Sequence, residues 1–102
     1  MSTLSKRIKQ ARVQSGLSQE LLGIRIGIDP ASASARMNRY ELAKRVPDLE
    51  LIERLADELG FPSAFFYAKE DEEAELLVKF HKLDLKLRKK VLAYIDSAAL
   101  DK

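Results

Sequence analysis

Glycine and proline recur at short intervals in the first two thirds of this 102-residue chain. Their positions restrict the possible folds more than any other feature of the sequence. Gly16, Gly27 and Gly60 fall where helices commonly end, while Pro30 and Pro47 fall where helices commonly begin. Between these positions the apolar residues recur three or four residues apart, which is the spacing of an amphipathic helix. No segment alternates β-branched and polar residues as an exposed strand does. The sequence therefore predicts an all-α fold made of short helices.

About seven helices are expected, the first three over residues 3–15, 18–26 and 30–42. The others are a fourth over 47–59, a short one within 61–67, and two more in 70–102. Ser2 or Thr3, Ser18, Asp29 and Asp84 are suitable N-caps. The residues expected to face the core are Leu4, Ile8, Ala11, Leu21, Leu22, Ile26, Ala33, Met37, Tyr40, Leu49, Ile52, Leu55, Ala56, Leu59, Phe65 and Phe66. We expect a domain over residues 1–68 and a helical extension over 69–102.

Charge is distributed unevenly along the chain. Residues 1–45 contain nine basic and three acidic residues (9 − 3 = +6), and residues 46–102 contain nine basic and thirteen acidic ones (9 − 13 = −4). This asymmetry favours an N-terminal surface that binds a polyanion. There is no cysteine, no apolar run of membrane-spanning length and no signal-peptide pattern, so we expect a cytoplasmic protein without disulfides.

The second and third expected helices have the form of a helix-turn-helix. The second helix is short, and Gly27 after it can take the positive φ that a tight turn often requires. Gly23 is small enough to let the two helices cross closely. The third helix has few bulky residues, because most of its positions hold Ala, Ser or the polar residues Arg36, Asn38 and Arg39. Such a helix is able to lie close to base edges in the major groove of DNA.

Two stretches carry a resemblance to a known family. Matching residues in the first stretch are Ile8, Lys9, Arg12, Gly16, Leu17, Ser18, Gln19, Glu20, Gly23 and Gly27. Those in the second are Tyr40, Glu41, Lys44, Arg45, Pro47, Leu51, Leu55, Ala56 and Leu59. Over roughly residues 4–67 the chain resembles the XRE/Cro-like, lambda-repressor-like family of DNA-binding proteins. The resemblance implies a five-helix DNA-binding domain, to which this chain adds two C-terminal helices.

The sequence departs from the family pattern at three places. Ala11 replaces a larger apolar residue, and Ala43 stands where the family usually has glycine. Between Gly27 and Glu41 the chain has about four extra residues, or roughly one helical turn. Either the third helix is one turn longer at its N-terminal end, or the turn before it is longer.

The exposed face of the third helix supplies the expected contacts to bases. Arg39 suits a bidentate contact to guanine and Asn38 one to adenine, each contributing about 1–3 kcal/mol of discrimination. Ser32 and Ser34 are adaptable polar contacts, and Ala35 fits against a thymine methyl group. The alternative is that the arginines are ordinary solvated helix residues.

Phosphate contacts are expected on either side of that helix. Ser18 and Gln19 lie at the N-terminus of the second helix, where free amide groups favour an anion. The resemblance implies that Lys44 and Arg45 meet the DNA backbone, and Arg36 is a further candidate. Such contacts set the register of the protein on DNA without reading sequence.

Other polar residues are given structural roles. We expect Arg12 and Glu41 to pair and brace the first helix against the third. His81 is the only histidine, with no second ligand near it in sequence, so no metal or cofactor is expected. The serines have no base partner and the carboxylates are dispersed, so no catalytic residues and no enzyme activity are expected.

The C-terminal extension carries more apolar residues than a five-helix domain needs. They are Leu76, Leu77, Phe80, Leu83, Leu87, Val91, Leu92 and Ile95. These residues either extend the core of the monomer or form a homodimer interface that places two recognition helices on a palindromic site; we favour the dimer. The basic run 86–90 is read as a solvated face, with a secondary phosphate contact as the alternative.

We therefore expect a sequence-specific, double-stranded DNA-binding transcriptional regulator, acting as a repressor. A related alternative is an antitoxin-like or phage-type repressor that also binds a protein partner through its C-terminal helices. A different class of alternative is a coactivator-like protein-interaction module that retains the fold without binding DNA.

Overall fold

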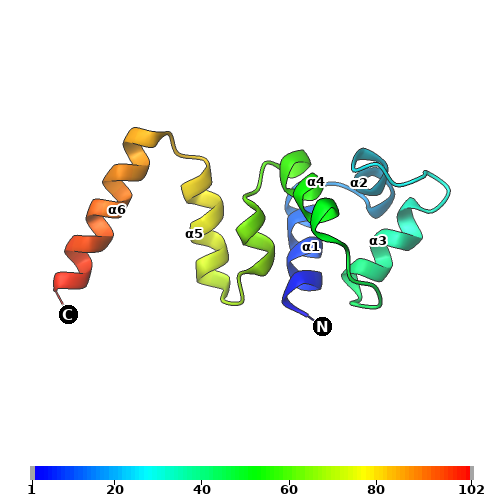
Figure 1. The fold of residues 1–102 in the computed structure, drawn as a ribbon, viewed down its shortest axis with the longest axis horizontal. Coiled ribbons are helices and arrows are strands. Elements are labelled where there is room, and N and C mark those ends of the chain that lie inside the picture. The colour runs from blue at the N-terminus through cyan, green and yellow to red at the C-terminus, as the bar shows by residue number, and fades with distance from the viewer. Residues whose placement is uncertain (1, 102) are drawn as a thin grey trace.

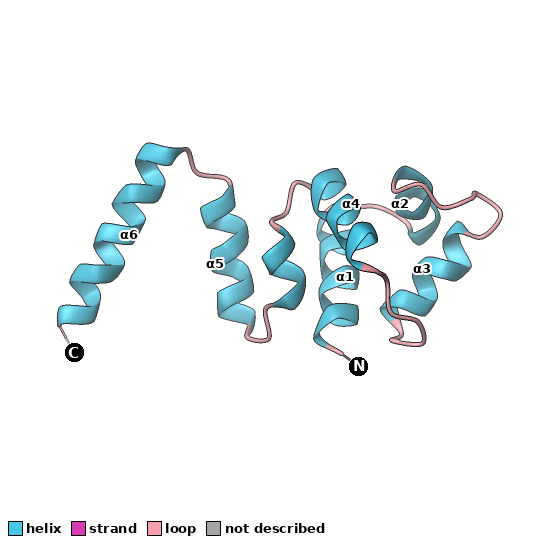
Figure 2. Ribbon diagram, viewed as in Figure 1, coloured by secondary structure: helices cyan, strands magenta, loops and turns pink. Residues whose placement is uncertain are grey.

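A computed structural model describes residues 2–101, and every regular element in this range is helical. The elements are α1 (Thr3–Gln14), α2 (Gln19–Arg25), α3 (Ala33–Glu41), α4 (Leu49–Leu59), the 3₁₀ helix η1 (Ser63–Tyr67), α5 (Asp71–His81) and α6 (Leu85–Leu100). Figure 2 shows these helices joined by short loops, with no strand among the described residues. The all-α prediction is confirmed, and so is the approximate number of helices.

Short polar side chains hold the N-termini of four α-helices. Ser2 and Ser5 form a reciprocal capping box on α1, and Ser18 Oγ accepts a hydrogen bond of 3.0 Å from the amide of Leu21. Asp48 and Asp84 cap α4 and α6 in the same way, at 2.8 and 2.9 Å. The predicted caps Ser2, Ser18 and Asp84 are therefore correct.

The third helix begins three residues later than predicted, at Ala33 instead of Pro30. Asp29 does not cap it. The Asp29 carboxylate accepts a hydrogen bond of 2.9 Å from the amide of Ala31, and its carbonyl accepts one of 2.9 Å from the amide of Ser32. These bonds close a separate turn over residues 29–32, because an aspartate side chain competes with the helix for nearby amides. The extra residues therefore lengthen the turn and not the helix.

The core lies among α1–α4 and η1, and α5 adds one residue, Ala74. Its buried apolar residues are Ile8, Ala11, Leu22, Ile26, Ile28, Ala33, Met37, Tyr40, Ile52, Leu55, Ala56, Phe61, Phe65, Phe66 and Ala74. Two of the residues predicted to face the core do not: Leu21 is 41% exposed and Leu49 is 64% exposed. Leu21 lies about 100° around α2 from the buried Leu22. Leu49 is the first residue of α4 and follows the exposed N-cap residue Asp48.

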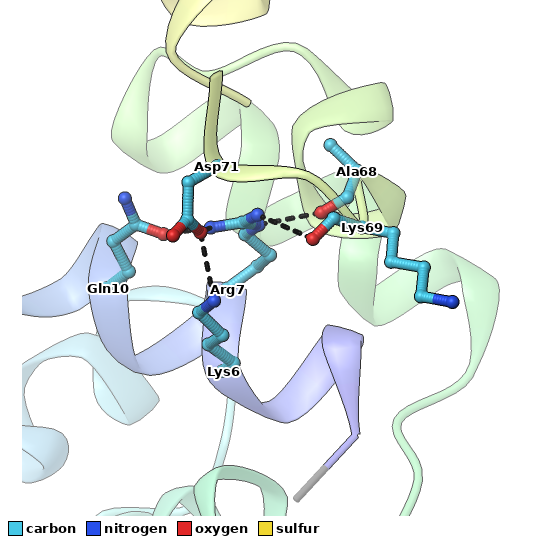
Figure 3. A network of polar contacts seen from close by, with 6 residues as sticks. All are labelled: Lys6, Arg7, Gln10, Ala68, Lys69 and Asp71. Atoms are coloured by element: carbon cyan, nitrogen blue, oxygen red, sulfur yellow. Dashed lines mark hydrogen bonds and ion pairs between the residues drawn. The ribbon is translucent and has the colours of Figure 1, made fainter. Parts of the chain in front are cut away.

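A fully buried arginine, Arg7 of α1, joins this core to the segment that follows η1. Its guanidinium donates hydrogen bonds to the carbonyl oxygens of Ala68 (2.8 Å) and Lys69 (3.3 Å), to Gln10 Oε1 (2.7 Å) and to Asp71 Oδ1 (3.0 Å). Figure 3 shows these partners converging on Arg7 from α1, from the segment between η1 and α5, and from the first residue of α5. Four of the five guanidinium N–H groups thus have acceptors, as a buried cation requires.

Asp71 is the exposed end of this network. It also accepts a hydrogen bond of 2.9 Å from Lys6 Nζ. The hydrogen bond from Lys6, followed by the one from Arg7, holds the pKa of the Asp71 carboxyl below its usual value. Asp71 is the first residue of α5, so the same contacts attach α5 to α1.

The two C-terminal helices extend away from the core. Within α5 only Ala74 is buried, and no residue of α6 is buried. Figure 1 shows α2 and α3 at one end of an elongated molecule and α6 at the other. The molecule measures 54 × 27 × 22 Å along its principal axes. Consequently α6 does not extend the core of the monomer, which was one of the two roles considered for it.

Candidate nucleic-acid interface

Helices α2 and α3 cross at unusually short range. A Cβ atom placed on Gly23 would lie 2.9 Å from the Cβ of Ala33, which is closer than real Cβ contacts. Gly27, in the turn between the helices, has a φ of +96°. Ala33, Met37 and Tyr40 are all buried, as predicted, and Ala33 lies directly against Gly23 of α2. The close crossing therefore requires the small residues that the sequence places there.

The opposite side of α3 is open to solvent and polar. Ser34, Ala35, Asn38 and Arg39 are all exposed there. Ser32 is also exposed, but it precedes the helix, where its side chain makes no capping hydrogen bond. Four of the five predicted base-contacting residues therefore share one helical surface, and the fifth lies at the adjoining end of the turn.

A hydrogen-bond network that the sequence did not reveal positions Asn38. Gln19 is the first residue of α2. Its side-chain nitrogen Nε2 donates hydrogen bonds to Asn38 Oδ1 at 3.3 Å and to Glu41 Oε1 at 3.2 Å. A carbonyl oxygen has a second lone pair, so Asn38 Oδ1 can still accept another hydrogen bond. Within residues 2–101 its own amide nitrogen donates to no protein group. Asn38 thus retains the donor and acceptor that a bidentate contact to adenine needs.

The same network continues to α1 through an ion pair. Arg12 Nε lies 2.6 Å from Glu41 Oε2, and a second guanidinium nitrogen lies 3.0 Å from Oε1. Their side chains are only 15% and 3% exposed. Arg12 also donates to the carbonyl of Leu17 at 2.9 Å. The predicted bracing role of this pair is confirmed, and it fixes α1, α2 and α3 relative to one another.

The predicted phosphate contacts surround α3 at several points. Ser18 is exposed at the N-terminus of α2, and Gln19 beside it is half-buried by its contacts with α3. Lys44 and Arg45 are exposed in the loop after α3. The loop is shaped by Ala43, which has a φ of +60°.

Arg36 lies apart from the exposed face of α3. It is half-buried and lines a polar groove of about 410 Å³ together with Tyr40, Arg45 and Arg54. The groove lies between the turn after α2, the loop after α3 and α4. Arg36 therefore faces this groove and not the exposed side of α3 that carries Asn38 and Arg39.

Two further properties of the described residues bear on function. No group of three His, Asp or Glu side chains in residues 2–101 is arranged to hold a metal ion. Over the same range, no helix combines the length and the apolar composition needed to cross a bilayer.

Two short helices crossing at a glycine, with a braced and solvent-exposed second helix, define a helix-turn-helix protein. The family model described as "Helix-turn-helix domain" matches residues 3–64, so the chain belongs to this family. This membership agrees with the resemblance to XRE/Cro-like proteins seen in the sequence.

A solved structure is similar over nearly the whole chain. It is described as the crystal structure of the transcriptional regulator BswR, and it is 41% identical to this chain with a TM-score of 0.85. The alignment covers 91% of this chain and 92% of the other. An alignment over 91% of the chain extends well beyond the family match at residues 3–64. The similarity therefore includes much of α5 and α6. No curated protein sequence gives a significant match.

Proposed function

We propose that this protein is a sequence-specific transcriptional regulator that reads double-stranded DNA in the major groove with α3. The observation that carries the proposal is the exposed surface of Ser34, Ala35, Asn38 and Arg39 on a helix held rigidly by its buried side. Membership of the helix-turn-helix family supports it, as does the likeness to a protein described as a transcriptional regulator.

On this proposal the roles divide by position. Arg39 and Asn38 read guanine and adenine, while Ser32, Ser34 and Ala35 make the remaining base contacts. Ser18, Gln19, Arg36, Lys44 and Arg45 contact phosphates.

The proposal includes repression and dimeric binding. A small protein covering its operator excludes other proteins from that DNA without needing a further domain, so we propose a cytoplasmic repressor. A single short module rarely supplies enough specific affinity, so we propose that a homodimer occupies a palindromic operator.

Fluorescence anisotropy on DNA selected from a genomic fragment library tests this function. Affinity should fall steeply between 50 and 200 mM salt, because phosphate contacts release counterions. Arg39→Ala should reduce the preference for the selected site by about 1–3 kcal/mol, whereas Lys44→Ala should weaken all sequences alike.

Lys82→Ala is the matched control, because it removes one positive charge at the end of α5, far from α3 along the chain. It should change neither affinity nor preference. A wild-type protein that selects no DNA at low salt would rule out the proposal and favour a protein-interaction module on this fold.

A further inference from the structure

The extra residues between α2 and α3 form a turn that projects from the molecule. Residues 29–32, which we call the inserted turn, are all exposed and lie at the end of the molecule opposite to α6 (Figure 1). The Asp29 carbonyl accepts a hydrogen bond of 2.9 Å from the amide of Ser32, which closes a β-turn with Pro30 at its second position. Only Ser32 among these residues has a role in the proposed function.

Both ends of the inserted turn are attached to α2. Before it, Ile28 is 5% exposed, and its amide donates a hydrogen bond of 2.9 Å to the carbonyl of Gly23. After it, Ala33 is fully buried against the same glycine. Inside the turn, Asp29 Oδ1 accepts a hydrogen bond of 2.9 Å from the amide of Ala31. The turn is therefore held at both ends and within, so a contact made by it costs little ordering entropy.

The inserted turn adjoins the residues of α3 that face DNA in the proposed function. In a helix-turn-helix, the N-terminal residues of the second helix contact base edges. Ser34 and Ala35 are the first exposed residues of α3, and the turn lies just before them in the chain. The ends of a β-turn lie within about 7 Å of each other, and base pairs are stacked about 3.4 Å apart. Asp29 therefore lies within about two base pairs of the position that Ser32 reaches.

The inserted turn also carries a negative charge on a basic part of the chain. Residues 1–45 contain only three acidic residues, Glu20, Asp29 and Glu41. Glu41 is paired with Arg12, and Glu20 lies in the first turn of α2, where the helix dipole favours a negative charge. Within residues 2–101 the Asp29 carboxylate has one partner, the amide of Ala31. An asparagine would close the same turn without a charge, so the turn alone does not account for an aspartate.

We propose that the inserted turn reads a base pair next to those contacted by α3, and that Asp29 Oδ2 accepts a hydrogen bond there from the amino group of a cytosine. Close to DNA, a carboxylate is repelled by the phosphates unless it meets a donor. In the major groove the donors are the amino groups of cytosine and adenine. Adenine also presents N7, an acceptor, whereas cytosine presents a donor and no acceptor of its own. Cytosine is therefore the base that an aspartate at this position selects.

This inference deepens the proposed function and rests on it, because it requires α3 to lie in the major groove. The two can nevertheless fail separately. Arg39→Ala tests the contact made by α3, and Asp29→Asn tests the contact made by the inserted turn.

Selection of bound DNA from a random-sequence library, followed by anisotropy on the selected site, tests the inserted turn. Wild type should select cytosine at one position beside the base pairs that Arg39→Ala affects, and replacing that cytosine should lower affinity about 5- to 10-fold. Asp29→Asn should abolish the preference for cytosine. The asparagine oxygen still accepts the amide of Ala31, so its amino group faces DNA, and guanine or thymine should be preferred instead.

Glu20→Gln is the matched control, because it also removes a negative charge from an exposed residue of this basic part of the chain. Both variants should raise affinity for all sequences by about 2- to 5-fold, since repulsion from the phosphates decreases. Glu20→Gln should leave the base preference at every position unchanged. Circular dichroism melts should give midpoints within about 2 °C for wild type and Asp29→Asn, because the turn keeps its hydrogen bond.

The possible outcomes separate the two proposals. If Asp29→Asn selects the same bases as wild type while Arg39→Ala alters the preference, the inference is overturned and the proposed function stands. A wild-type site without cytosine beside the base pairs of α3 overturns it too. A lowered melting midpoint, with preference lost at every position, would show that Asp29 only holds α3 in place. A wild-type protein that selects no DNA would overturn both proposals.

Discussion

At the scale of single residues, the side chains that assemble this protein are charged or polar groups with several partners. Arg7 is fully buried and holds α1, η1 and α5 together. Gln19 connects Asn38 to the Arg12–Glu41 pair. The pairing of Arg12 with Glu41 was predictable, because both positions belong to a family pattern. The roles of Arg7 and Gln19 as connectors were not predictable, because their partners lie up to 64 residues away in sequence.

The lowered pKa of Asp71 predicts how stability depends on pH. A carboxyl whose pKa is lower in the folded protein stabilises it above the unfolded pKa of about 4, and the contribution disappears as pH falls through the lower folded value. Urea denaturation should therefore show wild type to be more stable than Asp71→Asn at pH 7, with the difference vanishing as the pH falls through the lowered folded pKa of Asp71. Asp57→Asn, a change at an exposed aspartate of α4, should show no comparable difference. A difference that is constant with pH would exclude the ionised Asp71 as its source.

A substitution at Ala43 should stabilise the protein, whereas Asp71→Asn should destabilise it. Its φ of +60° is strained for a residue with a Cβ atom, and glycine relieves that strain. Ala43→Gly should raise the free energy of unfolding by about 0.5–1 kcal/mol, measured by urea denaturation. Ala35→Gly, at an exposed position inside α3, should lower it by about 1 kcal/mol. Equal destabilisation by both changes would show that residue 43 is not strained.

At the scale of helices, the existence and order of the elements were predictable from periodicity, caps and breaks. Boundaries were less so, as α3 illustrates. Asp29 followed by Pro30 is a suitable start for a helix, yet Asp29 forms its own turn and α3 begins at Ala33. Asp29 is able either to cap a helix or to close its own turn, so local sequence permits both starts. The observed turn is the one that sets Ala33 against Gly23, and that contact is not a local property of the sequence.

The crossing of α2 and α3 predicts the effect of one methyl group. Gly23→Ala would place a Cβ 2.9 Å from the Ala33 Cβ and 3.0 Å from the Ala33 carbonyl oxygen. We expect a loss of about 1–3 kcal/mol of stability, larger than the gain in helix propensity, and weaker DNA binding because α3 shifts. Thermal melts and anisotropy measure both effects.

The double variant Gly23→Ala, Ala33→Gly should recover only part of that stability, because the carbonyl contact remains. If Gly23→Ala is as stable as wild type, the helices do not cross as closely as described.

At the scale of the whole molecule, the contrast between α5 and α6 predicts the effects of truncation. Removing residues 84–102 should change the free energy of unfolding of a dilute, monomeric sample by less than about 0.5 kcal/mol, because α6 buries no residue. Removing residues 70–102 should lower it by at least about 1 kcal/mol, because it exposes the surface that Ala74 covers. Urea denaturation of both truncated chains measures this. A large loss from the shorter truncation would show that α6 stabilises the monomer.

The amino-acid sequence by itself determined the helical class, the order of the helices, most caps and the exposed polar side of α3. These properties depend on residues within about one or two helical turns of each other, so local spacing is sufficient to predict them. Only the tertiary structure decided where α3 begins, which charged residues join distant helices, and that α6 stands away from the core. Each of these depends on contacts between residues far apart in the chain, which no local pattern records. For the same reason amphipathic spacing predicted the apolar side of α6 but not whether the monomer covers it.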